Sequence, residues 1–295
     1  VINYCAKQNI AGCDSIWTGF HQYVLVNPGA PARITLSDPI NGESTLRTVD
    51  FSAADLGYPK AKREYKAVTL TLEREFDGVW SFQGSYTYAK NIGNIEGGVR
   101  SDNGQVDSGL TTAFDQPGLT DGTYGYLPTD VRHNIKAFGS YQATPWFTLG
   151  AQVQVQSPRH YGCIGRVPRT RDIFAGAYGA AGFYCNVANG QIITDPGYTG
   201  FSNTTTSTSL QLTPRGTEFK SDWLHFVNLS AVFKLPTESF SGRFRVDVFN
   251  VFNEQAVIDL QERGTQSSGR PRSDYRAPIS YQSPRYVRLQ LGFDF

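Results

Sequence analysis

The sequence predicts an all-β fold, an antiparallel transmembrane β-barrel, and three observations support this. Aromatic residues reach 13% although only 39% of the residues are hydrophobic. Several segments alternate apolar and polar residues with a period of two, as half-exposed strands do. Short connections between these segments alternate with long ones. Outer-membrane barrels combine these features, because their strands are apolar on one face and carry aromatic girdles at both interfaces.

Seven segments have the alternation of strands. They lie at about 65–76, 80–88, 131–142, 147–156, 223–235, 243–252 and 286–295. In the last segment, Val287, Leu289 and Leu291 share one face, and Arg288 and Gln290 share the other. The segment at 243–252 loses its period after Phe249, which predicts a bulge or a strand end.

The connections distinguish a membrane barrel from a soluble β-sandwich, whose strands alternate in the same way. Asp77-Gly78, Thr144 to Trp146 and Thr237 to Gly242 are short, whereas about 94–130, 158–221 and 258–283 are long. Long structureless loops are unusual in a compact soluble domain. Membrane barrels have short periplasmic turns and long extracellular loops. We therefore expect the three long segments on the outer side.

Barrel strands are predicted throughout residues 65–295, whereas 1–64 reads as a mainly extracellular loop region with a possible strand near 22–26. Seven is an odd number, but single-chain bacterial barrels have even numbers of strands. An unpaired strand edge is not tolerated in lipid. We expect a part of the protein that precedes Val1 to supply further strands; the alternative is a partner chain.

Four cysteines lie in polar, glycine-rich stretches, and none forms a C-x-x-C pair. Cys5 with Cys13, and Cys163 with Cys185, would each close a local loop. Disulfides of this kind indicate an oxidising compartment. Four unpaired thiols are the alternative.

Several functions are not indicated. The net charge of +1 offers no basic face for nucleic acid. There is no P-loop, H-E-x-x-H or G-x-S-x-G motif, so we expect neither an enzyme nor a cofactor or metal site. The Asp-rich segment that begins at Asp102 does not have the spacing of an EF-hand calcium loop, and its carboxylates are expected to be solvated turn residues; calcium binding by this segment is the alternative.

Two groups of residues are candidates for binding. The loop at 158–221 combines arginine and aromatic residues, as binding surfaces do, and these are Arg166, Arg169, Arg171, Tyr178 and Tyr184. The polar strand faces place mixed charges on the inner wall, among them Arg243, Arg245, Asp247 and Arg288. For the inner wall, a hydrated surface with salt bridges is the alternative to substrate contact.

Several motifs together resemble a known family. They are KREYKAVTLTLEREFDGVWSFQGSYTYAKNIGN at 62–94, SDNGQVDSGL at 101–110, YGYLPTDVRHNIKAFGSY at 124–141, VDVFNVFNEQ at 246–255 and RYVRLQLGFDF at 285–295. Over about residues 60–295 the chain resembles the TonB-dependent outer-membrane receptors, in particular their Oar-like branch. Within the motifs YGCIG and FYCN, Cys163 and Cys185 look like the paired loop cysteines of that branch.

The resemblance implies the C-terminal portion of a barrel of on the order of 22 strands, closed by an N-terminal plug. It implies a receptor in the outer membrane of a Gram-negative bacterium that binds an external ligand and imports it with TonB-derived energy. An adhesion or structural protein with partner-binding loops, or a passive porin, is the alternative.

The resemblance also implies partners. These are outer-membrane lipids, the TonB complex, which would act through an N-terminal part that precedes Val1, and an external ligand of unknown identity. Accessory surface proteins are possible partners. Phe293 and Phe295 resemble the C-terminal signal that the barrel-assembly machinery recognises.

Overall fold

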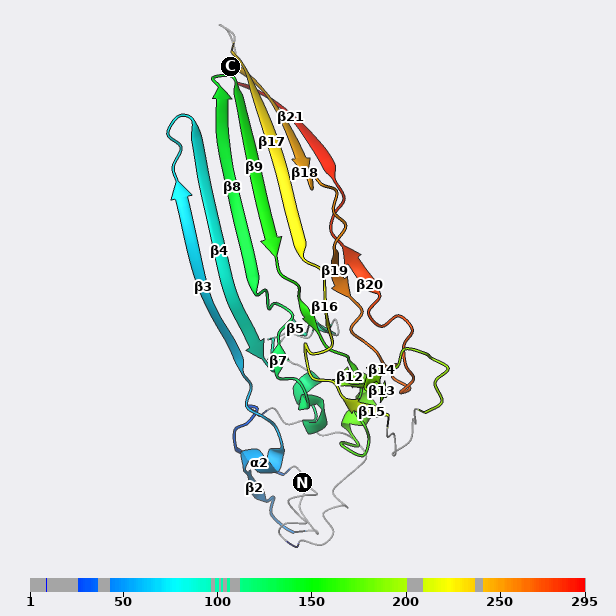
Figure 1. Ribbon diagram of the computed structural model, residues 1–295. Helices are drawn as coiled ribbons and strands as arrows, with labels where there is room; N and C mark the ends of the chain where they lie inside the picture. Colours follow the sequence, from blue (N-terminus) through cyan, green and yellow to red (C-terminus); the bar gives the residue numbers. More distant parts are fainter. Residues whose placement is uncertain are drawn as a thin grey trace.

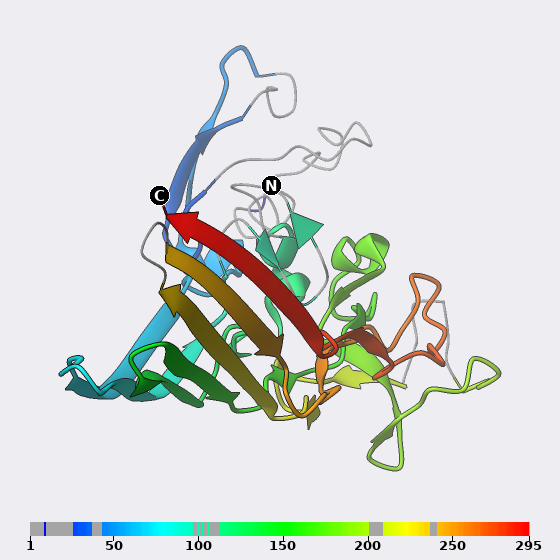
Figure 2. The same cartoon turned by 90° about the horizontal axis from the view of Figure 1, so that it is seen from above.

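One antiparallel sheet dominates the computed structural model, which describes residues 9, 26–36, 43–96, 99–100, 102, 105–106, 112–200, 209–236 and 241–294. Its seven long strands are, in spatial order, β3 (Arg63–Arg74), β4 (Trp80–Gly93), β8 (His133–Thr144), β9 (Phe147–Gln156), β17 (Leu224–Pro236), β18 (Ser241–Phe249) and β21 (Tyr286–Asp294). The short strand β7 (Gly125–Tyr126) also pairs with β4. All seven predicted strands are confirmed, with ends shifted by a few residues. The sheet bends into an open arc whose two edges are β3 and β21 (Figure 2).

Short turns and long connections lie at opposite ends of the sheet (Figure 1). Gly78 has a φ of +97°, and the Asp77 carboxylate accepts the N–H groups of Val79 and Trp80, which closes the first turn. At the other end, β18 stops because Asn250 adopts a φ of +49°. The alternation of short and long connections is therefore confirmed, and the lost period after Phe249 is a strand end.

The strand register collects the apolar residues on one face. Val246 lies opposite Ala231 on one side and Leu289 on the other. Leu70 is 66% exposed and Leu289 is 64% exposed, although both are large and apolar. An apolar band of this extent is suited to lipid acyl chains. We call this the outer face of the sheet.

The outer face ends in an aromatic group on the side of the long loops. The Tyr86 hydroxyl lies 2.9 Å from Nδ1 of His133. The His133 ring also contacts Tyr88 and Trp223, with ring centroids 5.3 Å and 6.2 Å apart. Amphipathic rings at this height match the aromatic girdle at a membrane interface.

The opposite, inner face is polar and is held together by cross-strand side-chain pairs. The hydroxyls of Ser81 and Ser140 lie 2.8 Å apart. Asn228 donates to the side-chain oxygen of Gln152 over 3.2 Å. The sheet thus has one lipid-compatible face and one hydrated face, as the period of two predicts.

The long connections contain most of the buried apolar side chains, among them the fully buried Tyr161, Ile164, Val167 and Phe183. They are not structureless. Their short elements are β5 (Val99–Arg100), β6 (Gln105–Val106), η3 (Thr112–Phe114), η4 (Pro117–Thr120), β10 (His160–Tyr161), β11 (Gly165–Arg166), η5 (Ala175–Tyr178), β12 (Ala180–Gly182), β13 (Tyr184–Ala188), β14 (Gln191–Ile192), β15 (Leu210–Leu212), β16 (Phe219–Lys220), β19 (Val257–Leu260) and β20 (Pro278–Tyr281). Because the outer face of the sheet has only lipid to contact, the protein core of this chain lies in its loops.

The N-terminal region has structure that the sequence pattern did not indicate. β1 (Ala32–Thr35) pairs with β2 (Thr48–Phe51), and helix α2 (Ala53–Leu56) follows, capped by Ser52. Elements of four residues are too short to show a period. The strand expected near 22–26 falls mainly on residues outside the described ranges. None of the described helices has the length and apolar character needed to span a bilayer.

Candidate functional site

A disulfide between Cys163 and Cys185 lies at the centre of the loops. Both cysteines are fully buried. The disulfide packs against the backbone of Gly264, where an added Cβ would come within 2.2 Å of the Cys163 sulfur. The predicted Cys163–Cys185 pair is thus present, and it also fixes how closely the loop at 258–283 can approach. Cys5 and Cys13 lie outside the described residues.

Glu262 joins the same two loops next to the disulfide. Its Oε1 accepts the N–H of Gly162 over 2.7 Å, and its Oε2 lies 3.4 Å from Arg159. Tyr275 donates its hydroxyl to the carbonyl of Gly162 over 3.1 Å. Burial, reinforced by the nearby Asp102 carboxylate, raises the pKa of Glu262 to about 7. This carboxyl group therefore titrates near neutral pH.

Arg215 joins the loop at 94–130 to the loop at 158–221. Its side chain is only 3% exposed and lies 2.9 Å from Glu96 and 3.2 Å from Asp102. The guanidinium also lies over the ring of Phe183, 5.0 Å from the centroid. A buried cation needs such partners because desolvation is costly. The expectation that Asp102 is a solvated turn residue is wrong, since burial beside Arg215 gives it a structural role.

Asp121 forms a second connection between these loops. Its two oxygens accept from Arg171 over 2.7 and 3.0 Å, and Oδ2 also accepts the Tyr184 hydroxyl over 2.7 Å. A third carboxylate, Asp130, is fully buried and bonds to Arg132 over 3.0 Å. These carboxylates are likewise not solvated turn residues. Within the described ranges, no group of three or more His, Cys, Asp or Glu residues could hold a metal ion.

The predicted ligand-binding residues differ in how they are bonded within the loops. Arg166 donates to the carbonyls of Gly176 and Ser267, so it bonds within the loops, as do Arg171 and Tyr184. Arg169 is exposed. The side chain of Tyr178 lies outside the described ones. Ligand binding by the five residues stays a prediction, and the structure adds that three of them hold the loops together.

Sequence reasoning missed Glu262 and Arg215. Their partners lie about a hundred residues away, since Glu262 bonds Gly162 and Arg215 bonds Glu96. No local spacing signals such a contact. In the sequence of a polar, glycine-rich loop, a charged residue that is buried looks the same as one that is exposed to solvent.

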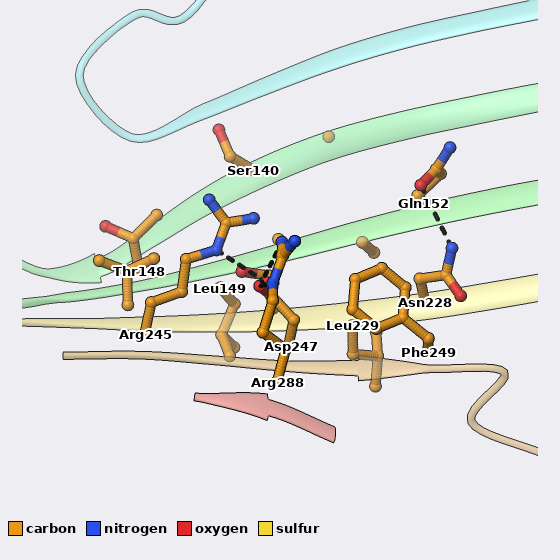
Figure 3. A pocket seen from close by; sticks show the side chains of 15 residues that line it. Ser140, Thr148, Leu149, Gln152, Asn228, Leu229, Arg245, Asp247, Phe249 and Arg288 are labelled. Carbon is orange, nitrogen blue, oxygen red and sulfur yellow. Dashed lines mark hydrogen bonds and ion pairs between the residues drawn. The ribbon is translucent and has the colours of Figure 1, made fainter. Parts of the chain in front are cut away.

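The inner face of the sheet carries a hollow of about 430 Å³ (Figure 3). Side chains that line it from the inner face include Ser140, Thr148, Gln152, Asn228, Arg245, Asp247, Phe249 and Arg288. Asp247 is 3% exposed and accepts from Nε of Arg245 over 2.7 Å. Arg288 reaches the other Asp247 oxygen through Nε and Nη2 over 3.0 and 2.8 Å. We call this the inner-wall hollow.

Comparison with known proteins places the chain among outer-membrane proteins. The family described as "Outer membrane beta barrel domain" matches residues 17–156. The TonB-dependent transporter Oar of Myxococcus xanthus is 24% identical over 328 residues, which cover 96% of this chain and 28% of Oar. The chain thus spans a little over a quarter of the length of that relative.

Solved structures with similarity to this chain include two outer-membrane proteins. The outer membrane transporter YddB from Escherichia coli is 14% identical, with 90% of this chain and 28% of that chain covered and a TM-score of 0.42. The siderophore receptor PiuA from Acinetobacter baumannii is 10% identical, with 79% and 22% covered and a TM-score of 0.40. The sequence matches place this chain in the outer membrane of a Gram-negative bacterium and show that it is similar to part of the TonB-dependent transporter Oar.

Proposed function

We propose that the protein is an outer-membrane receptor that binds an external ligand at its loops and imports it with TonB-derived energy. In this proposal the chain forms the C-terminal part of the barrel wall, and a plug and the TonB contact belong to another part of the protein. The relationship to Oar supports this reading. Lipids contact the outer face, and the barrel-assembly machinery inserts the strands.

The main support for the proposal is that the loops are joined to one another. Three connections far apart in sequence are joined by the Cys163–Cys185 disulfide packed on Gly264, by Glu262 and by Arg215. A binding surface that is already ordered loses less conformational entropy when a ligand binds. Loops at the rim of a rigid scaffold are also where binding usually resides. The ordered loops are therefore suited to capturing a ligand outside the cell.

Uptake by intact cells tests the transport function. Cells with and without the gene, each with and without TonB, are grown in a defined mixture of solutes, and the solutes removed from the medium are measured. We expect at least one solute whose removal requires both the gene and TonB. Removal that requires the gene but persists without TonB would support a passive porin and contradict energised import.

Two exposed positions of the same loop test where the ligand binds. Arg169→Ala removes an exposed guanidinium near the proposed site, whereas Gln191→Ala changes an exposed side chain on the hairpin of β13 and β14. We expect Arg169→Ala to weaken ligand binding by cells about tenfold, the effect of losing one charge-assisted contact, with Gln191→Ala close to the parent. Loss of adhesion to surfaces in the gene deletion, with unchanged uptake, would favour the adhesion alternative.

A further inference from the structure

The inner-wall hollow has features that transport by the loops does not explain. Its lining residues lie on β8, β9, β17, β18 and β21 (Figure 3). Its volume of about 430 Å³ falls within the roughly 300–1,000 Å³ of small-molecule pockets. The hollow is large enough for a small solute or for one end of a larger one.

A buried carboxylate holds two arginines at the edge of this space. Asp247 accepts from Nε of Arg245, and from Nε and Nη2 of Arg288. The bond through Nε leaves the terminal amino groups of Arg245 directed toward the hollow (Figure 3). The side chains of Arg245 and Arg288 are 45% and 56% exposed, whereas that of Asp247 is 4% exposed. The nearly buried Asp247 thus orients both guanidiniums.

The surroundings favour negative charge. Among the residues that line the hollow, two are cationic and one is anionic, namely Arg245, Arg288 and Asp247. The other polar residues of the lining offer hydroxyl and amide groups, from Ser140, Thr148, Gln152 and Asn228. Guanidinium groups bind carboxylates and phosphates through paired hydrogen bonds. The net charge and the donors therefore select the same class of ligand.

We propose that the inner-wall hollow is a binding subsite for an oxyanion, the carboxylate or phosphate of a small solute inside the barrel. Arg245 and Arg288 supply the charge and the hydrogen bonds, and Asp247 is a positioning residue. This assignment goes beyond the proposed function, because it concerns the inner wall and does not depend on which ligand the loops capture or on TonB.

Thiol labelling of the full-length protein in detergent micelles tests the subsite. Thr148→Cys places a thiol in the hollow, and the parent protein reports any background from its own cysteines. The thiol is labelled with an anionic and with a cationic methanethiosulfonate reagent, in chloride, inorganic phosphate or acetate at equal ionic strength. We expect faster labelling by the anionic reagent and saturable protection by at least one oxyanion. The more protective anion shows whether phosphate or carboxylate is preferred.

Charge-removing variants make the test specific. Arg288→Gln in the Thr148→Cys background should lower the ratio of anionic to cationic labelling rates about fivefold, for one charge a few ångströms away, and should abolish protection. Arg245→Gln is an independent second variant, since each leaves Asp247 one arginine partner. Lys136→Gln removes one charge from the inner face of β8 outside the hollow and should leave protection unchanged. Heat-dependent gel mobility verifies that each barrel is folded.

Three outcomes would overturn the proposal. One is labelling that phosphate and acetate slow no more than chloride does. Another is protection that survives in both Arg288→Gln and Arg245→Gln. The third is a thiol that neither reagent reaches in the folded full-length protein, which would mean that another part of the protein occupies the hollow.

Discussion

At the scale of single residues, buried charged side chains hold the loops together. Arg215, Glu262 and Asp130 each lie almost entirely out of solvent, and each has an oppositely charged or hydrogen-bonding partner. Removing one partner of a buried ion pair costs far more than removing a surface pair, because an uncompensated charge is left behind. Loss of Arg215 should therefore disturb two loops, although it lies in only one.

Glu262 predicts how the loops respond to pH. Its pKa in the folded protein, about 7, is raised above the ordinary value of 4.5, so the folded state holds a proton that the unfolded loop releases. Its contribution to stability is therefore fully present below about pH 4.5 and is lost as the pH rises through 7. We expect amide hydrogen exchange at Gly162 and Ile164, corrected for intrinsic rates, to show weaker protection at pH 8 than at pH 5.

The matched variant for this prediction is Glu262→Gln, which keeps a side-chain oxygen to accept from Gly162 but cannot ionise. Protection in this variant should vary much less between pH 5 and pH 8. If the variant and the parent show the same pH dependence, another group is responsible. His160 is the nearest alternative, since burial beside Lys220 lowers its pKa and it lies 3.8 Å from Asp130.

At the scale of elements, each strand contributes one lipid-facing and one inner-facing row. Leu289 and Gln290 are adjacent on β21 but belong to opposite faces, because Leu289 pairs with Val246 and Gln290 with Arg245. A shift of the register by one residue would exchange the two faces. The alternation of apolar and polar residues in each strand therefore matches the lipid on one side of the sheet and the hydrated space on the other.

Arginine substitutions at these two positions should have different consequences. Leu289→Arg places a charge on the lipid face near the middle of β21 and should reduce the free energy of unfolding by about 2–4 kcal/mol. Gln290→Arg places the same side chain on the hydrated inner face and should cost much less. Denaturant titration of the full-length protein in lipid vesicles measures both. Equal destabilisation by the two variants would contradict the assignment of the faces.

The disulfide is the element that most restricts the loop at 158–221. It joins residues 22 apart in sequence, and closing a loop of that length reduces the entropy of the unfolded loop by an amount worth about 3 kcal/mol. Replacing both Cys163 and Cys185 with serine should speed proteolysis of this loop on intact cells, with little change in the amount of barrel inserted. If the amount of inserted barrel falls as strongly as the resistance of the loop to proteolysis, the disulfide is needed for assembly instead.

At the scale of the whole molecule, the sheet is an arc with two edges. β3 and β21 end the strand order, and the described residues contain no strand that joins them. Strand edges in a bilayer leave backbone groups without hydrogen-bond partners. Completion of the wall by further strands stays a prediction, and the chain matches only 28% of its relative Oar.

Phe295, proposed as part of an assembly signal, should matter more for assembly than for stability. Phe293 lies on the lipid-facing row, opposite Gly242, and Phe295 lies outside the described residues. We expect removal of Phe295 to reduce membrane insertion in cells several-fold while leaving the stability of inserted protein nearly unchanged. Phe252→Ala, at an exposed aromatic outside the final strand, is the control. Normal insertion without Phe295 would contradict its role as an assembly signal.

The sequence by itself determined the strands and their two faces. The alternation in 286–295 predicted both that β21 forms and which side of it meets lipid, because the side chains of a strand point alternately to its two faces and the bilayer accepts only apolar ones. The tight turn at Asp77-Gly78 could be predicted for a similar reason, since only local backbone geometry is involved. The Cys163–Cys185 pair was likewise a local prediction.

Only the tertiary structure decided how the loops are joined and what the inner wall presents. Glu262 meets Gly162, and Arg215 meets Asp102, across loops whose sequences show no period. At the inner-wall hollow, strand pairing places Arg288 beside Asp247, which also accepts from Arg245 on its own strand. Such contacts depend on segments that are distant in the chain and adjacent in space, so a local pattern can predict the face on which a residue lies but not its partner.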